Sequence, residues 1–444
     1  MALATPETIR TLQRKLYRKA KQEPGFRFYA LYDKVFRADI LGHAYALVRR
    51  NKGAPGVDVV SFEAIEGGEG VEAFLAGLEE DLKAKTYRAA PVRRVSIPKP
   101  DGGERPLGIP IIRDRVAQAA VKLVIEPIFE ADFREMSYGF RPKRSAHDAS
   151  DAVAEALRCG HAHVIDADVS KYFDTIPHAK LLAVVAERIA DGPILGLIKQ
   201  WLKAPVVEEL AGGRGRWGGG KGSRRGTPQG GVIPPLLANL YLHLLDRIWE
   251  RWRLAERCGA RLVRYADDLV VLCAGDVEPA LALLRRVLRR LGLSLNEAKT
   301  RVVDAREESF DFLGFTFGLR RSRKSGKVYP HVEPSKRAVR RINGRLSVLS
   351  HRRRTLLPLE VVVEQMNQAL RGWGGYFHHR NCSKVFGRVR WHAEERLRTH
   401  LRKRHKVRRR KSGYRRFPTR KLYDRYGLYK LPTTAGWTRA HALR

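Results

Sequence analysis

Arg261 to Cys273 reads RLVRYADDLVVLC, in which two apolar runs flank the adjacent acids Asp267 and Asp268. The β-branched and aromatic residues on both sides favour strands, and Asp tolerates the tight turn between them. The stretch therefore predicts an apolar hairpin with both acids at its tip. Adjacent carboxylates repel each other and are costly without a cation. Oxygen ligands suit Mg²⁺, and paired metals on shared carboxylates are typical of phosphoryl transfer. The alternative is an exposed polar turn.

A second acidic block precedes the hairpin. His163 to Pro177 reads HVIDADVSKYFDTIP, an alternating apolar run that ends at Asp168. If this strand lies beside the hairpin in one sheet, the carboxylate at its end meets the acidic turn. Between the two blocks, Gly226 to Leu242 reads GTPQGGVIPPLLANLYL, which predicts a rigid Gly/Pro turn that leads into an apolar helix.

These three stretches resemble the motifs of the group II intron reverse transcriptase/maturase family. D-V-x-x-Y-F-D, GTPQGG-V-I-x-P-L-L-A-N and YADD occur in the family's order. RPLGIP (Arg105 to Pro110) and SYGFRPKRSAHDA (Ser137 to Ala149) upstream, with FLGF (Phe312 to Phe315) downstream, strengthen the match. The resemblance covers roughly residues 51–406. One departure is Pro234, where the family usually has Ser before the second Pro.

The resemblance implies an α/β right-hand polymerase (fingers–palm) followed by an all-α thumb/maturase domain and a basic tail. The implied segments are an N-terminal helical extension with the start of the fingers (1–90), the fingers–palm (91–318), the thumb/maturase helices (319–405) and a basic DNA-binding-like tail (406–444). The implied reaction is RNA-directed DNA synthesis, in which Asp168, Asp267 and Asp268 hold two Mg²⁺ ions. The implied partners are the parent group II intron RNA, which the protein helps to splice, a DNA target and primer, and dNTPs.

The resemblance also assigns a dNTP-binding group. Lys99 and Arg105 flank a Pro/Gly hairpin turn, where cations could clamp a triphosphate, or else they are two solvated surface charges. Phe173 matches the position at which a ring crowds the sugar 2′-carbon and excludes ribonucleotides; otherwise it is a core Phe. Lys299 matches the lysine proposed to protonate the leaving pyrophosphate, or it is an exposed loop lysine. Gln229 can reach a base or sugar edge.

Four positions are predicted to contact nucleic acid. SYGFRPKRS interleaves aromatic residues with Arg141 and Arg144, and this combination suits stacking on bases together with phosphate contact. In the alternative, Phe140 belongs to the core. Gly230 lets the backbone approach a ligand closely, and Gly314 of FLGF is assigned a nucleic-acid contact by the resemblance.

The net charge of +39 is unevenly distributed. Residues 319–444 carry 36 Lys/Arg against 6 Asp/Glu, a density that implies a polyanion such as nucleic acid. No membrane partner is expected, because no apolar run approaches ~20 residues. The tail offers no Cys/His cluster for an HNH nuclease. Four scattered cysteines and an N-terminus without a signal-peptide core favour the cytoplasm, in a ribonucleoprotein and at DNA.

Local patterns add two structural predictions. The Gly/Arg-rich run Ala211 to Arg225 predicts a flexible loop. Three helices are expected in the basic C-terminal part, at Pro334 to Ser350, Leu359 to Arg380 and Ser383 to His405.

Two other functions fit parts of the sequence. One is a splicing cofactor with a vestigial polymerase site, against which the three intact Asp residues argue. The other is an adopted reverse transcriptase in host defence or repair. Intron domains in the DNA around the gene would distinguish that role from mobility.

Overall fold

The two acidic blocks come together in one four-stranded antiparallel sheet of the computed structural model, which describes residues 3–98, 103–209, 215–220, 222–228 and 230–437. Its strands, in order across the sheet, are β6 (Ala260–Tyr265), β7 (Asp268–Cys273), β3 (His163–Asp168) and β8 (Arg301–Asp304). This sheet is called the palm sheet below. The predicted hairpin and its pairing with the earlier acidic strand are confirmed.

Helices cover both faces of the palm sheet: α7 (Ala146–Arg158) on one face, and α11 (Pro234–Arg251) with α13 (Glu278–Leu291) on the other. Val164 and Val270 pack in the cluster that contains α7. Ile165 and Val271 pack in the cluster that contains α11 and α13. Alternate residues of a strand point to opposite faces, so the apolar runs of these strands are buried on both sides.

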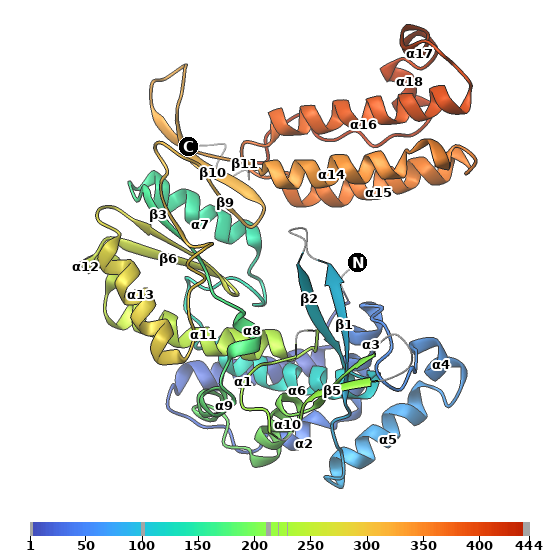
Figure 1. Ribbon diagram of the computed structural model, residues 1–444. Coiled ribbons are helices and arrows are strands. Elements are labelled where there is room, and N and C mark those ends of the chain that lie inside the picture. Colours follow the sequence, from blue (N-terminus) through green and yellow to red (C-terminus); the bar gives the residue numbers. More distant parts are fainter. Residues whose placement is uncertain (1–2, 99–102, 210–214, 221, 229, 438–444) are drawn as a thin grey trace.

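The N-terminal half builds the fingers around the long buried helix α6 (Figure 1). Its helices are α1 (Glu7–Gln22), α2 (Tyr32–Val35), α3 (Ala38–Arg50), α4 (Phe62–Gly67), α5 (Val71–Lys83), α6 (Ile112–Glu130), α9 (His178–Ala186) and α10 (Gly192–Leu202). Its sheet has the order β2-β1-β4-β5, with β1 (Val92–Pro98), β2 (Glu104–Ile109), β4 (Pro205–Glu209) and β5 (Gly215–Gly219). Two short helices, α8 (Tyr172–Thr175) and α12 (Leu254–Arg257), lie near the palm strands.

The prediction of a flexible loop at Ala211 to Arg225 is wrong for its middle part. Gly215–Gly219 forms β5, which pairs antiparallel with β4 so that Trp217 lies opposite Val207. Cross-strand pairing supplies the backbone hydrogen bonds here, and a Gly/Arg-rich composition does not reveal that pairing. Residues 211–214 lie outside the described part of the chain.

The C-terminal part begins with the antiparallel strands β9 (Phe310–Phe312), β10 (Phe315–Arg321) and β11 (Val328–Pro334). The thumb helices α14 (Lys336–Leu349), α15 (Leu359–Phe377) and α16 (Ser383–Arg404) follow, with the short turn η1 (Arg352–Arg354) between the first two. The three predicted helices are thus confirmed. Figure 1 shows them in orange and red, on the side of the molecule toward which the β1–β2 hairpin points.

As far as Trp437, where the described part of the chain ends, the basic tail packs with the thumb and forms no separate unit. It contains α17 (Arg410–Arg416) and α18 (Thr419–Asp424), and its apolar residues belong to the same buried cluster as the thumb helices: Phe417, Leu422, Leu428 and Leu431. The expected boundary at residue 405 therefore cuts through a hydrophobic core. Charge had marked the tail as a separate segment, but these four apolar side chains attach it to the thumb.

Among the described residues, no helix combines the length and the apolar character needed to cross a bilayer.

Candidate active site

Asp168 and Asp268 lie directly opposite each other on β3 and β7. Asp268 is also paired with Tyr265 on β6, which leaves Ala266 and Asp267 as the two turn residues of the hairpin. Directly opposed residues of an antiparallel pair place their side chains on the same face, and like charges in that position are destabilising. The fold thus concentrates carboxylates at one end of the palm sheet, where a cation would be favourable.

Asn296 and Lys299, which follow α13 in the chain, both contact Asp168. The Asn296 side-chain amide donates to Asp168 Oδ2 at 3.1 Å, and the Asn296 backbone N–H donates to the Asp168 carbonyl at 2.8 Å. Lys299 Nζ lies 3.9 Å from the same Oδ2. The sequence pointed to Lys299 through a resemblance but missed Asn296, whose only signal is its position three residues before that lysine.

The carboxylates suit a hard divalent cation, because Mg²⁺ prefers oxygen ligands. Within the described residues, no group of three or more His, Cys, Asp and Glu side chains is already gathered as a metal site. What the fold provides is a pair of opposed carboxylates and a third in the adjoining turn. Asp166 lies on the same face of β3, 3.7 Å from Arg301, and burial raises the pKa of its carboxyl group.

The Gly/Pro turn lies beside Phe173. The Thr227 backbone N–H donates to the Phe173 carbonyl at 2.7 Å, and the Gly226 N–H donates to the Ile176 carbonyl at 2.9 Å. Phe173 is half-buried, with its ring edge-on to Tyr172 at a centroid distance of 5.5 Å. It is therefore neither a fully buried core residue nor an exposed one.

The same turn reaches the fingers sheet. Gly230 has a φ of 117°, and a Cβ at this position would lie 2.4 Å from the Gly108 carbonyl oxygen of β2. Only glycine permits this close approach, so Gly230 joins the palm to the fingers hairpin. Among the other predicted dNTP contacts, Lys99 and Gln229 lie outside the described residues, as does the side chain of Arg105.

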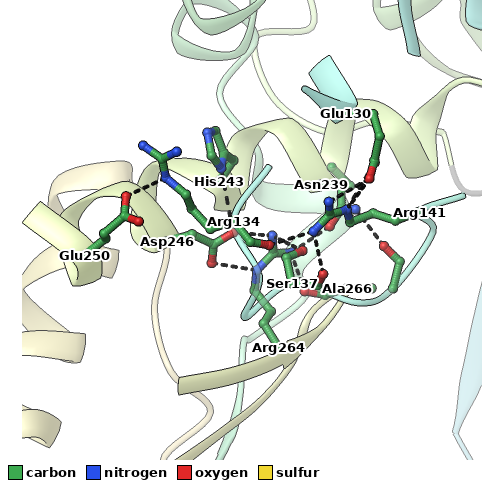
Figure 2. Close-up of polar contacts among 12 residues, drawn as sticks. Glu130, Arg134, Ser137, Arg141, Asn239, His243, Asp246, Glu250, Arg264 and Ala266 are labelled. Carbon is green, nitrogen blue, oxygen red and sulfur yellow. Dashed lines mark hydrogen bonds and ion pairs between the residues drawn. The ribbon is translucent and has the colours of Figure 1, made fainter. Parts of the chain in front are cut away.

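Arg141 does not occupy the position expected for a nucleic-acid contact. Its side chain is only 5% exposed and pairs with Glu130 at 2.6 Å (Figure 2). It also donates to the carbonyls of Arg134 and Ser137. A guanidinium that is buried and bound to acceptors of its own chain cannot also reach a phosphate, so this prediction is corrected to a structural role.

Arg144 and Phe140 remain near the surface. The Arg144 guanidinium lies 5.4 Å from the centre of the Tyr138 ring, and Phe140 is 46% exposed, which excludes the core alternative for Phe140. Gly314 forms the turn between β9 and β10 with a φ of 82°, and its Cα faces the Phe377 ring of α15. A glycine here allows the palm-side turn and the thumb to approach closely.

Two family models match the chain in succession. The model described as reverse transcriptase (RNA-dependent DNA polymerase) matches residues 97–317. The model described as group II intron, maturase-specific domain matches residues 339–417. The first spans the candidate active site, and the second spans the thumb helices together with α17.

Several known proteins are similar to this chain. Protein YkfC of Escherichia coli is 34% identical over 71% of this chain and 90% of its own length. Group II intron-encoded protein LtrA of Lactococcus lactis is 30% identical over 68% of this chain, which spans 59% of LtrA. Among solved structures, apo telomerase from Candida tropicalis aligns with 14% identity and a TM-score of 0.42, over 55% of each chain.

Proposed function

This chain belongs to the reverse transcriptases that carry a group II intron maturase-specific domain, and from this premise we propose that it copies RNA into DNA at the acidic end of the palm sheet. The observation that carries the proposal is the register that sets Asp168 opposite Asp268, next to the Asp267 turn. Opposed carboxylates at a strand end are unfavourable on their own, and they are the ligands that metal-assisted nucleotidyl transfer requires.

In the proposed reaction, the primer 3′-hydroxyl attacks the α-phosphorus of a dNTP, a new P–O bond forms and pyrophosphate leaves. Asp168, Asp267 and Asp268 would hold two Mg²⁺ ions, which supply charge stabilisation for the attacking and leaving oxygens. Asn296 fixes the Asp168 carboxylate through its amide. Lys299 carries a proton close to this carboxylate and is assigned to protonate the pyrophosphate.

The position of Phe173 supports a role in sugar selection. Its carbonyl accepts from the Thr227 N–H of the Gly/Pro turn, and the same turn touches β2 through Gly230. The predicted dNTP contacts Lys99, Arg105 and Gln229 belong to these same two segments. A dNTP bound between the β1–β2 hairpin and Asp168 would therefore lie near Phe173.

RNA binding is proposed for the thumb. The exposed face of α14 carries Arg337, Arg340, Arg341 and Arg345, and residues 319–444 hold most of the chain's net positive charge. This density suits the phosphates of a folded RNA, because each neutralised phosphate releases counterions. We propose group II intron RNA as that ligand, DNA as the primer and target, and a cytoplasmic ribonucleoprotein as the setting.

The test is primer extension by the purified protein on an RNA template with an annealed DNA primer, dNTPs and Mg²⁺. Wild type should incorporate dNTPs, and Asp168→Asn should reduce the rate by about 10²–10³-fold, the range of losses seen when a group central to transition-state stabilisation is removed. Asp276→Asn is the matched control, because this exposed acid lies beyond the far end of β7. A wild-type protein that extends no primer would contradict the proposed function.

A further inference from the structure

Arg264 lies on β6, three residues before Asp267, and its side chain is fully buried. Sequence patterns indicate only a strand residue at this position, yet it is the largest completely buried side chain among the described residues. Figure 2 shows its guanidinium at the centre of a polar cluster between β6, α11 and the segment that contains Ser137. A buried charge is tolerated only where it is paired and hydrogen-bonded, so this cluster needs an explanation.

Every N–H of the Arg264 guanidinium has an acceptor. Nε and Nη2 donate to the two oxygens of Asp246 at 2.9 and 2.6 Å, and Nη2 also donates to Ser137 Oγ at 2.6 Å. Nη1 donates to Asn239 Oδ1 at 2.6 Å and to the Ala266 carbonyl at 3.1 Å. Burial alone would raise the pKa of the Asp246 carboxyl, but the neighbouring guanidinium holds it below its usual value, so the pair is ionised.

The Ala266 carbonyl links this cluster to the acidic turn. Ala266 has a φ of 58°, a left-handed conformation in which the Cβ of an alanine is crowded by the backbone. Such a conformation persists only where the surrounding structure enforces it. The hydrogen bond from Arg264 holds the carbonyl of this strained residue, and the next residue in the chain is Asp267.

A second contact with the same residue comes from Gly139. The Asn239 amide donates to the Gly139 carbonyl at 2.6 Å, while its oxygen accepts from Arg264. A Cβ on Gly139 would lie 2.4 Å from the Ala266 backbone nitrogen, so the Gly139 backbone packs directly against the turn. Asn239 thus couples the two segments that enclose Ala266.

We propose that Arg264 is a positioning residue that, through Ala266, holds the turn in the conformation in which Asp267 and Asp268 can bind a divalent cation together with Asp168. The metal-binding role of these carboxylates rests on the proposed function. Arg264 itself does not touch substrate or metal; it acts on the backbone between itself and Asp267.

Arg264→Lys tests the geometry while keeping the charge opposite Asp246. Lysine has three donors on one atom and lacks the planar fork that reaches Asp246, Asn239 and Ala266 together. Arg188→Lys is the matched control: Arg188 is also buried, donates to backbone carbonyls that include that of Ala20, and pairs with Asp132 in the fingers. Both variants lose a buried guanidinium, but only one of them loses a bond to the turn.

Gly139→Ala is a second, independent perturbation. It pushes on the Ala266 backbone and leaves the Arg264–Asp246 pair intact, so it decides the question if Arg264→Lys does not fold. For each protein, Mn²⁺ binding is monitored by electron paramagnetic resonance, in which the signal of the free ion is lost on binding. The part of the Mn²⁺ binding that is lost in Asp267→Asn is the part that depends on the acidic turn. Thermal unfolding and the Mg²⁺ concentration for half-maximal primer extension are measured in parallel.

Arg264→Lys and Gly139→Ala should each weaken Mn²⁺ binding by about 10-fold or more, the size of effect expected for residues that orient metal ligands. They should raise the Mg²⁺ requirement to a similar degree, whereas Arg188→Lys should bind Mn²⁺ as wild type does, whatever its thermal stability. An unchanged Mn²⁺ affinity in a folded Arg264→Lys or Gly139→Ala protein overturns the proposal. The proposal is also overturned if the wild-type protein binds Mn²⁺ no more tightly than Asp267→Asn does. If the wild-type protein binds Mn²⁺ through Asp267 but extends no primer, the proposed function fails. The positioning role of Arg264 is then still tested by comparing the Mn²⁺ affinities of the variants with that of wild type.

Discussion

Lys299 Nζ lies 3.9 Å from Asp168 Oδ2, next to the carboxylate at the end of β3. The lysine side chain is 60% exposed and the aspartate side chain 38%, and an ion pair this open to water contributes little to stability. The ion pair therefore adds little to the stability of the fold.

Lys299→Ala and Lys299→Arg together test whether Lys299 donates a proton or only supplies a positive charge. Arginine keeps the charge near Asp168 but does not release its proton in a protein. If Lys299 protonates the pyrophosphate, both variants should lose about 10²-fold in the rate of single-nucleotide incorporation, measured by rapid quench. A near-normal rate for Lys299→Arg with a slow Lys299→Ala would assign to Lys299 only an electrostatic role.

Asp267→Asn should separate DNA synthesis from RNA binding. The substitution removes one carboxylate of the acidic turn and leaves the basic face of α14 unchanged, so primer extension should be lost while the affinity for group II intron RNA and the splicing of that intron persist. Filter binding and a splicing assay at matched Mg²⁺ concentrations measure the two activities. Loss of splicing with unchanged RNA affinity would show that both tasks use the acidic site.

Phe173→Ala should admit ribonucleotides. Phe173 is half-buried and its backbone carbonyl accepts from the Gly/Pro turn; the bulk of its ring is the proposed barrier to a 2′-hydroxyl. The ratio of kcat/KM for a dNTP to that for the matching rNTP should fall by at least about 10-fold, which corresponds to about 1.4 kcal/mol of discrimination. Phe173→Leu keeps part of the bulk and should fall in between. If this dNTP-to-rNTP ratio is unchanged in Phe173→Ala, Phe173 has a packing role and does not select the sugar.

The tail is expected to have two separable roles. Truncation after His405 removes Phe417 and three leucines from the thumb core, so the thumb should unfold in calorimetry; Phe417→Ala alone should cost about 3–5 kcal/mol. Changing the exposed residues Arg409, Lys411 and Arg415 to Gln should leave the melting temperature unchanged.

This triple variant, which lacks three positive charges, should instead bind nucleic acid more weakly. Each phosphate contact that is lost should flatten the plot of log affinity against log salt by about 0.7–0.9. A salt slope equal to that of wild type would show that these three cations do not contact nucleic acid.

Asp114 should make the fingers less stable as pH rises. Burial raises the pKa of this carboxyl group to about 6, although it accepts hydrogen bonds from Tyr87 Oη and the Ala90 N–H. Between about pH 4 and pH 6 the folded protein holds a proton that the unfolded chain has released, so stability falls with rising pH, by up to about 3 kcal/mol. The same decline should be absent from Asp114→Asn in urea unfolding across this range. Parallel curves for the two proteins would contradict the raised pKa.

The sequence by itself determined the local elements that carry the chemistry. Alternating apolar residues around Asp168 and around the Asp267–Asp268 pair specify strands with acids at their ends, because the two-residue period of a strand is written in the chain. The thumb helices followed from their own period in the same way. The order of the motifs was sufficient to indicate the family, which the comparisons then confirmed.

Only the tertiary structure decided which partner each side chain meets. Arg141 and Arg264 are both buried, and each pairs with an acid on another element: Glu130 for the first and Asp246 for the second. Asn296 reaches Asp168 across 128 residues, and Phe417 joins a core that its basic neighbours conceal. Burial and hydrogen bonding depend on contacts between distant segments, and a local pattern contains no information about them.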